Sequence, residues 1–140
     1  MMHAGRPAPR GARLPRSGME SLAISLGQHS KSGCKPLNQD FHGALIPGQP
    51  ALELKGITIA LADGISSSDV GAVAAETAIK SLLTDYYGTS DAWSVKTAAH
   101  RVIAATNAWL HAQTLARASD DVDNGYVCTL SVLILKSRAA

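Results

Sequence analysis

One uninterrupted apolar run that ends in an Asp-Gly pair constrains this chain more than any other feature. Between Gly56 and Asp63 lie six apolar or β-branched residues, and Gly64 follows the aspartate. A run with almost no polar side suits a strand that is covered on both faces. A carboxylate at the tip of such a strand, beside a glycine whose carbonyl can be approached closely, suits a hard cation. The same residues also fit a plain strand-to-helix turn, in which Asp63 bonds local N–H groups and Ser67 or Ser68 caps the next helix.

The composition predicts a globular protein with neither a nucleic-acid nor a membrane partner. The chain has 140 residues, 46% of them hydrophobic and 17% charged, which fits one domain or a piece of a larger one. The formal net charge of +2 depends on four arginines within residues 1–19, and without them nine basic residues face eleven acidic ones. A basic face for nucleic acid is therefore not expected. No apolar run approaches the ~20 residues that cross a bilayer.

The N-terminal segment differs in composition from the rest of the chain. Residues 1–19 are rich in Pro, Gly and Arg, and we expect them to be disordered because they cannot bury enough apolar surface to offset chain entropy. The globular domain is then expected over residues 20–140. Met19 as the true start and an organelle transit peptide are alternatives for this segment. Cys34 and Cys128 lack metal-binding spacing, which favours a reduced, cytoplasmic protein over one with an isolated disulfide.

Hydrophobic periodicity predicts three strands, then two helices, then a fourth strand. Alternation predicts a half-buried strand over 21–29, and apolar runs predict strands over 41–46, 57–62 and 127–135. Helices are expected over 69–87, where Val73 and Ile79 widen an apolar stripe, and over 92–116. The short connection between the helices predicts antiparallel packing. Segregated strands and helices indicate an α+β fold, with a β-sheet layered against an antiparallel helix pair.

A second candidate site lies in the polar loop before the 41–46 strand. The segment from Lys35 to Asp40 reads Lys-Pro-Leu-Asn-Gln-Asp and places a cation five residues before a carboxylate. Lysine is a compact point charge that attracts phosphate, and Asp40 can hold a divalent cation directly or through water. For this segment taken alone, a solvated loop with an Asx turn is the alternative.

Together, the two sites resemble the metal-dependent protein phosphatases of the PP2C (PPM) family. The family's first motif is usually R-x-x-N-[EQ]-D, which Lys35 to Asp40 follow with Lys in place of Arg. Its second motif is D-G-x-G or a variant, which begins here with Asp63 and Gly64. Residues 128–135 resemble the small-Thr-apolar strand that follows the family's helix pair. The resemblance spans residues 21–135 and extends to bacterial members, some of them fused to a Ser/Thr kinase domain.

The resemblance implies hydrolysis of phosphoserine and phosphothreonine in proteins, with two Mn²⁺ or Mg²⁺ ions as cofactors. Asp63 would bridge the metals, Gly64 would donate its carbonyl, and Asp40 would support the cluster directly or through water. Lys35 would hold the phosphoryl oxygens while a metal-activated water attacks phosphorus in line. Hard oxygen ligands explain why the motifs need no His or Cys. The partner would be a phosphorylated protein substrate, such as the target of a fused or neighbouring kinase.

The sequence departs from the family pattern at several positions. Lys35 lacks the bidentate fork of the usual Arg, Gln39 stands where many members have Glu, and Ser66 and Ser67 stand where glycines often occur. Family domains are much longer and use further aspartates, whereas no carboxylate follows Gly125. We therefore expect the N-terminal half of an α-β-β-α sandwich, with an uncovered apolar sheet face. The alternatives are a non-catalytic interaction or regulatory module of the same fold, an inactive fragment, and a cation-binding domain of unrelated fold.

Overall fold

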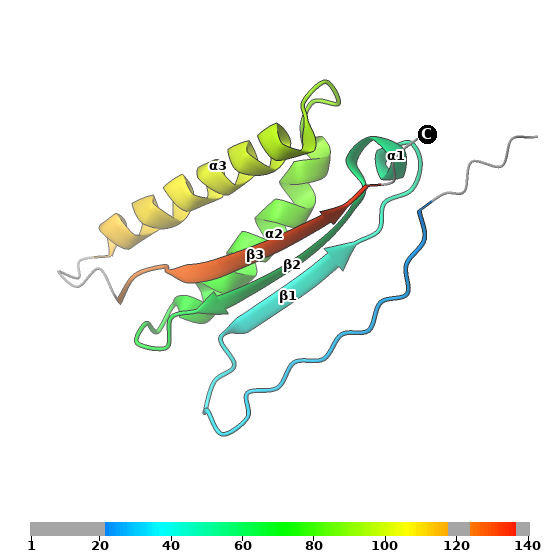
Figure 1. Ribbon diagram of the computed structural model, residues 1–140. Helices are drawn as coiled ribbons and strands as arrows, with labels where there is room; N and C mark the ends of the chain where they lie inside the picture. The colour runs from blue at the N-terminus through cyan, green and yellow to red at the C-terminus, as the bar shows by residue number, and fades with distance from the viewer. Residues whose placement is uncertain (1–21, 118–123, 137–140) are drawn as a thin grey trace, which may run out of the picture.

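The computed structural model describes residues 22–117 and 124–136, with elements in the order β1, α1, β2, α2, α3 and β3. Their bounds are β1 Asp40–Leu45, α1 Ala51–Lys55, β2 Ile57–Gly64, α2 Gly71–Gly88, α3 Val95–Ala116 and β3 Cys128–Leu135. Within the described residues the strands form a three-stranded antiparallel sheet in the order β1-β2-β3 (Figure 1). The fold is therefore α+β, as predicted. The segment 1–19, for which disorder was predicted, lies outside the described residues.

The helices cover one face of this sheet. α2 packs across all three strands, and α3 packs antiparallel against α2, as the short connection between them predicted (Figure 1). Ala60 and Ala62 of β2 are buried against Ile79 and Leu82 of α2. Because the sheet offers such small side chains, the helix can lie close to the strands. Among the described residues, no helix is long and apolar enough to cross a bilayer.

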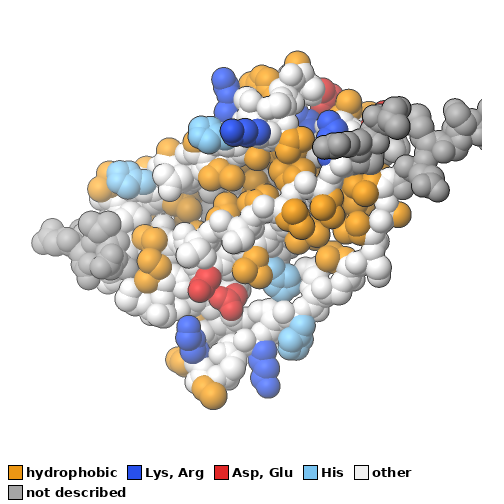
Figure 2. Space-filling view, in the orientation of Figure 1, with side chains coloured by type: hydrophobic (Ala, Val, Ile, Leu, Met, Phe, Trp, Pro, Cys, Tyr) orange, Lys and Arg blue, Asp and Glu red, His pale blue; other side chains and the backbone are white. Residues whose placement is uncertain are grey.

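The opposite face of the sheet carries no helix among the described residues. Alternation along the paired strands places on it Asp40, His42 and Ala44 of β1, Ile59, Leu61 and Asp63 of β2, and Thr129, Ser131 and Leu133 of β3. We call these nine residues the outer face. Leu61 and Leu133 are 55% and 53% exposed on it. Figure 2 shows hydrophobic side chains gathered over the end of β1 and the start of β2, and acidic side chains where β1 begins and β2 ends.

The predicted strand over 21–29 is wrong for the part that the structure describes. Residues 22–29 form no strand. The predicted alternation in burial holds only over 22–25, where Leu22 and Ile24 are half-buried and Ala23 and Ser25 are exposed, because Leu26, the next apolar residue of the pattern, is 40% exposed. Residues 26–29 instead lie over the sheet, where they line a cavity of about 220 Å³ together with residues 42–44 and 59–61. Alternation reports half-burial, whereas a strand also needs a neighbour that accepts its backbone hydrogen bonds.

The remaining elements differ from prediction mainly at their ends. α1 was not predicted, because five residues between two turn signals are too short for a helical period to show. α2 begins two residues after the predicted start at Asp69, and α3 begins at Val95, where Ser94 caps it by accepting the Thr97 N–H at 3.1 Å. Both cysteines are free thiols, and burial raises the pKa of Cys128.

Candidate metal centre

The two aspartates singled out from the sequence lie directly opposite each other in the sheet. In the β1–β2 register, Asp40 is paired with Asp63, at the point where β1 begins and β2 ends. The neighbouring Gly64 N–H donates to the Gln39 carbonyl at 3.0 Å, so Asp40 and Asp63 occupy a non-hydrogen-bonded position. Side chains of an antiparallel pair are closest at such positions, where Cα atoms are about 4.5 Å apart. Both side chains point to the outer face and are exposed.

Neither carboxylate of this pair is neutralised within the described residues. The ion pairs found there involve other acidic residues, and Asp40 contributes only its backbone N–H, which donates to Asn38 Oδ1 at 3.1 Å. Like charges directly opposite each other destabilise an antiparallel pair. Carboxylate oxygens are the ligands that Mg²⁺ and Mn²⁺ prefer. Asp40 and Asp63 are therefore the candidate carboxylate ligands for a divalent cation.

The described residues include the three predicted metal ligands, Asp40, Asp63 and Gly64, but not a full ligand set for two metal ions. They contain no group of three or more His, Cys, Asp or Glu side chains that could hold a metal ion. Gly64, the third predicted ligand, ends β2 beside the pair. A Cβ atom built on Gly64 would lie 2.2 Å from the Gly71 carbonyl oxygen, so glycine is also required there for α2 to approach the strand. The need for glycine at this position is therefore partly a matter of packing.

Lys35, the predicted phosphate ligand, lies in a cleft formed by the loops before β1 and after β2. The cleft has a volume of about 370 Å³ and is lined by Lys35, Pro36, Leu37, Gln39, Ser66, Ser67, Ser68 and Asp69. Lys35 is exposed, and its backbone N–H donates to the Ser32 carbonyl at 3.2 Å. One wall of the cleft is the segment that directly precedes Asp40. The other wall is the loop that follows Asp63 and Gly64. The loops that carry the predicted phosphate and metal ligands are thus neighbours.

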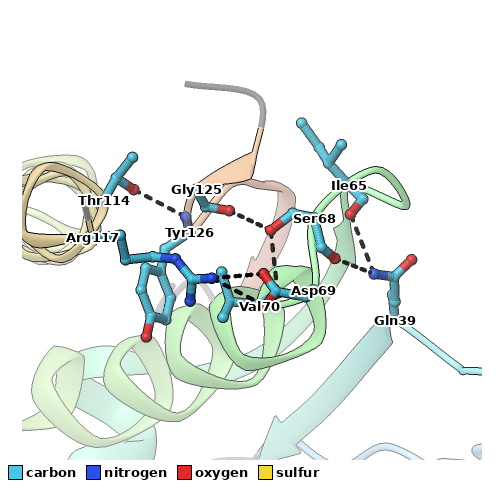
Figure 3. A network of polar contacts seen from close by, with 9 residues as sticks. All are labelled: Gln39, Ile65, Ser68, Asp69, Val70, Thr114, Arg117, Gly125 and Tyr126. Carbon is cyan, nitrogen blue, oxygen red and sulfur yellow. Dashed lines mark hydrogen bonds and ion pairs between the residues drawn. The ribbon is translucent and has the colours of Figure 1, made fainter. Parts of the chain in front are cut away.

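Gln39 has a role that sequence reasoning missed. Its Nε2 donates to the carbonyl oxygens of Ile65 and Ser68, at 3.2 and 3.0 Å (Figure 3). Together with the backbone bond from Gly64, these contacts fasten the loop after Asp63 to the loop before Asp40. The sequence presented Gln39 only as a departure from Glu. No periodicity or spacing indicates where a loop carbonyl will lie, so no sequence signal pointed to this contact.

A second set of contacts holds the same loop from the other side. The buried Ser68 hydroxyl donates to the Gly125 carbonyl at 2.7 Å and accepts the Val70 N–H at 3.2 Å. Asp69 accepts two hydrogen bonds from the Arg117 guanidinium, at 2.8 and 3.0 Å, which hold the pKa of Arg117 above its usual value. The loop is thereby tied to the end of α3 and to the residues before β3 (Figure 3). The N-cap residue of α2 is Val70 and no side chain caps this helix, so the predicted capping by Ser67 or Ser68 is wrong.

Comparisons of this chain with models of protein families, with curated proteins and with solved structures found no match.

Proposed function

We propose that this chain forms part of a PP2C-like phosphatase domain, in which the Asp40–Asp63 pair binds Mn²⁺ or Mg²⁺. The activity proposed is metal-dependent hydrolysis of phosphoserine and phosphothreonine in proteins. The observation that carries the proposal is the β1–β2 register. It sets opposite each other the two carboxylates that the resemblance identifies, from motifs that lie in different loops. If Asp63 were only part of a strand-to-helix turn, nothing would require a second carboxylate without an ion-pair partner to lie opposite it.

Each residue of the site would have its own role in this reaction. Asp63 and Asp40 would hold the cations, and the Gly64 carbonyl would add a neutral oxygen ligand. The bound cations would supply the Lewis acidity that activates a water molecule for in-line attack on phosphorus. Lys35, from the wall of the adjacent cleft, would orient the phosphoryl oxygens and offset their charge. The resemblance implies further ligands for a site with two metal ions. We propose that these ligands are water molecules or groups outside the described residues.

The outer face, which carries no helix among the described residues, supports the finer fold assignment, the N-terminal half of an α-β-β-α sandwich. Leu61 and Leu133 are more than half exposed on a sheet whose other face is covered by α2. Large exposed apolar residues on one face are typical of a surface that another layer covers. The free thiols of Cys34 and Cys128 agree with the cytoplasmic location that we propose.

Hydrolysis of a phosphothreonine peptide by the purified chain tests the proposed activity. We expect turnover with Mn²⁺, loss of turnover with EDTA, and loss in Asp63→Asn. The control is Asp85→Asn, which changes an exposed carboxylate on α2 and should leave turnover unchanged. Turnover that survives EDTA, or that survives Asp63→Asn, would contradict the assignment of Asp63.

A non-catalytic interaction module is the second candidate function. It is favoured by the same exposed leucines of the outer face and by the presence of only two facing carboxylates at the candidate centre. In that case the chain would bind a partner through its sheet, and Mn²⁺ would produce no turnover. Turnover in the peptide assay would therefore exclude a purely non-catalytic module, whereas its absence would also fit a phosphatase domain whose remaining metal ligands lie outside the described residues.

A further inference from the structure

We propose that Gln39 is a positioning residue that holds Asp63 opposite Asp40 through hydrogen bonds from its side-chain amide, and that it is not itself a metal ligand. This inference rests on the proposed metal site. Gln39 immediately precedes Asp40 and contacts the loop after Asp63 at three points. Its carbonyl accepts the Gly64 N–H at 3.0 Å, and its Nε2 donates to two loop carbonyls, those of Ile65 and Ser68 (Figure 3).

The chemistry of the two acceptors fixes the orientation of the Gln39 amide. Main-chain carbonyl oxygens only accept hydrogen bonds, so the nitrogen of the amide must face them. Nε2 carries two N–H groups and meets one carbonyl with each, at 3.2 and 3.0 Å. An ionised glutamate has no donor and would place a negative charge against both oxygens. At this position a glutamine side chain can therefore make two hydrogen bonds that an ionised glutamate of almost the same shape cannot make.

The start of α2 leaves room for this side chain. A Cβ atom built on Gly71 would lie 2.6 Å from the Ile65 carbonyl oxygen and 3.1 Å from Gln39 Nε2. Glycine at the first residue of α2 thus allows the amide to reach the loop. The Ser68 hydroxyl holds the loop on its other side by donating to the Gly125 carbonyl. Gln39 connects this loop to the residue that directly precedes Asp40, so it supports the placement that the β1–β2 register gives the two carboxylates.

The Gln39→Glu variant separates a positioning role from a direct effect of charge near the metal, because the two roles predict changes of opposite sign in Mn²⁺ affinity. A side chain that acted through its charge would bind Mn²⁺ more tightly as a carboxylate, since added ligand charge strengthens cation sites. A side chain that acts as a donor would lose both hydrogen bonds as a carboxylate. Asp63 would then be held less well, and groups that orient ligands typically contribute tenfold or more to metal affinity.

The test is a Mn²⁺ titration of the full 140-residue chain, with free Mn²⁺ followed by its electron paramagnetic resonance signal. We expect Gln39→Glu to raise the Mn²⁺ Kd about 10- to 100-fold, and Gln39→Met, which lacks the donor without adding charge, to raise it similarly. Gln49→Glu makes the same change at an exposed residue beyond the far end of β1 and should leave the Kd unchanged. A Gln39→Glu variant that binds Mn²⁺ as tightly as the wild type, or more tightly, would overturn the inference.

The outcomes distinguish this inference from the proposed function. If the wild-type chain binds no Mn²⁺, the metal site itself is wrong, and the role of Gln39 falls with it. If the wild type and Gln39→Glu bind equally, only the role of Gln39 is wrong. Should both Gln39 variants fail to fold, hydrogen exchange of the Gln39 side-chain amide in the wild type decides. Coupling is reciprocal, so Mg²⁺ should slow this exchange, and exchange unaffected by Mg²⁺ would contradict positioning.

Discussion

At the residue scale, each carboxylate of the Asp40–Asp63 pair raises the free energy of the metal-free fold. The two side chains share a non-hydrogen-bonded position of the β1–β2 pair, and no cationic side chain of the described residues pairs with them. Repulsion at such positions costs stability. A cation between them removes this cost, which links metal binding to stability.

We therefore predict that Asp63→Asn stabilises the metal-free chain. Removing one of two facing charges should raise the free energy of unfolding by about 0.2–1 kcal/mol in EDTA. Urea unfolding followed by circular dichroism measures the change, and Asp85→Asn serves as the control because Asp85 is exposed on α2. A lower unfolding midpoint for Asp63→Asn would show that the aspartate forms stabilising contacts in the absence of metal.

Tyr86 gives the fold a predicted dependence on alkaline pH. Its hydroxyl is fully buried and donates to the Lys55 carbonyl at 2.9 Å; burial, and then the neighbouring Tyr87, raises the pKa of Tyr86 to about 12. In the unfolded chain tyrosine titrates near pH 10. The unfolded state therefore loses the proton first, so stability is intact below pH 10 and falls between pH 10 and 12.

Tyr86→Phe should remove this part of the pH dependence. Urea midpoints measured from pH 8 to pH 11.5 are expected to fall less steeply above pH 10 in the variant than in the wild type. The variant should also be less stable at pH 8 by about 1–3 kcal/mol, because the Lys55 carbonyl loses its donor. Equal slopes above pH 10 would mean that Tyr86 does not carry the effect.

Sequence reasoning identified some residues of the candidate site and not others. Asp40 and Asp63 stand in motifs whose residue types match hard-cation chemistry, and the register places them together. Their pairing across strands could not be read from the chain, because register depends on which strands neighbour each other. Gln39 was missed because its partners are carbonyl oxygens, and every residue has one. Contacts to the main chain leave no pattern in a sequence.

At the scale of elements, α1 is joined to the α2–α3 connection by a buried lysine. Lys55 Nζ donates to the Thr89 carbonyl, the Thr89 hydroxyl and the Ser90 carbonyl, at 3.0, 2.8 and 2.9 Å. It also lies 3.7 Å from a carboxylate oxygen of Asp91. A cation next to the last carbonyls of a helix is favourable. The short helix that the sequence did not predict therefore anchors the end of α2 opposite the candidate metal centre.

Lys55→Met is expected to destabilise the fold by about 2–4 kcal/mol, because it removes a buried charged donor from three partly buried acceptors. The matched control is Lys80→Met, in which the lysine is exposed and pairs with Glu76 on the surface of α2. That change should cost less than about 0.5 kcal/mol. Urea unfolding of both variants gives the comparison. Similar costs for the two lysines would refute the anchoring role of Lys55.

The contact between α2 and the end of β2 depends on glycine. Gly71→Ala would place a Cβ atom 2.6 Å from the Ile65 carbonyl oxygen, which only a shift of the loop or the helix can relieve. We predict a loss of about 1–3 kcal/mol and weaker Mn²⁺ binding, since Asp63 lies at this junction. Gly48→Ala is the control, because nothing lies within 4 Å of a Cβ atom built there. If Gly71→Ala left the free energy of unfolding unchanged, the junction between α2 and β2 would have room for the added Cβ atom.

Element types were more predictable than element limits. The α2 stripe predicted the buried Ile79 correctly, but Val73 is 47% exposed, because a fourfold repeat fixes the centre of a helix face and not its width. The segment 22–29 alternates in burial only over residues 22–25 and pairs with no strand among the described residues. In both cases the pattern predicts burial only in part, because the neighbouring element that covers a side chain lies elsewhere in the chain.

At the scale of the whole molecule, the sheet separates a face covered by helices from a face that is covered only in part, by residues 26–29. Its outer face combines exposed leucines with the acidic pair at one end (Figure 2). Apolar surface of this kind binds partners or promotes self-association. We predict that replacing Leu61 and Leu133 together by Gln lowers binding of the dye ANS without lowering the urea midpoint. Undiminished dye binding would mean that the accessible apolar surface lies elsewhere.

The Mn²⁺ titration of the wild-type chain, with Asp40→Asn and Asp63→Asn beside it, tests the facing-carboxylate site most directly. We predict that the wild type binds Mn²⁺, that either single substitution weakens binding at least about tenfold, and that Asp85→Asn binds as the wild type does. If the wild type binds no Mn²⁺, or if both substitutions leave its affinity unchanged, the two aspartates are not a metal centre.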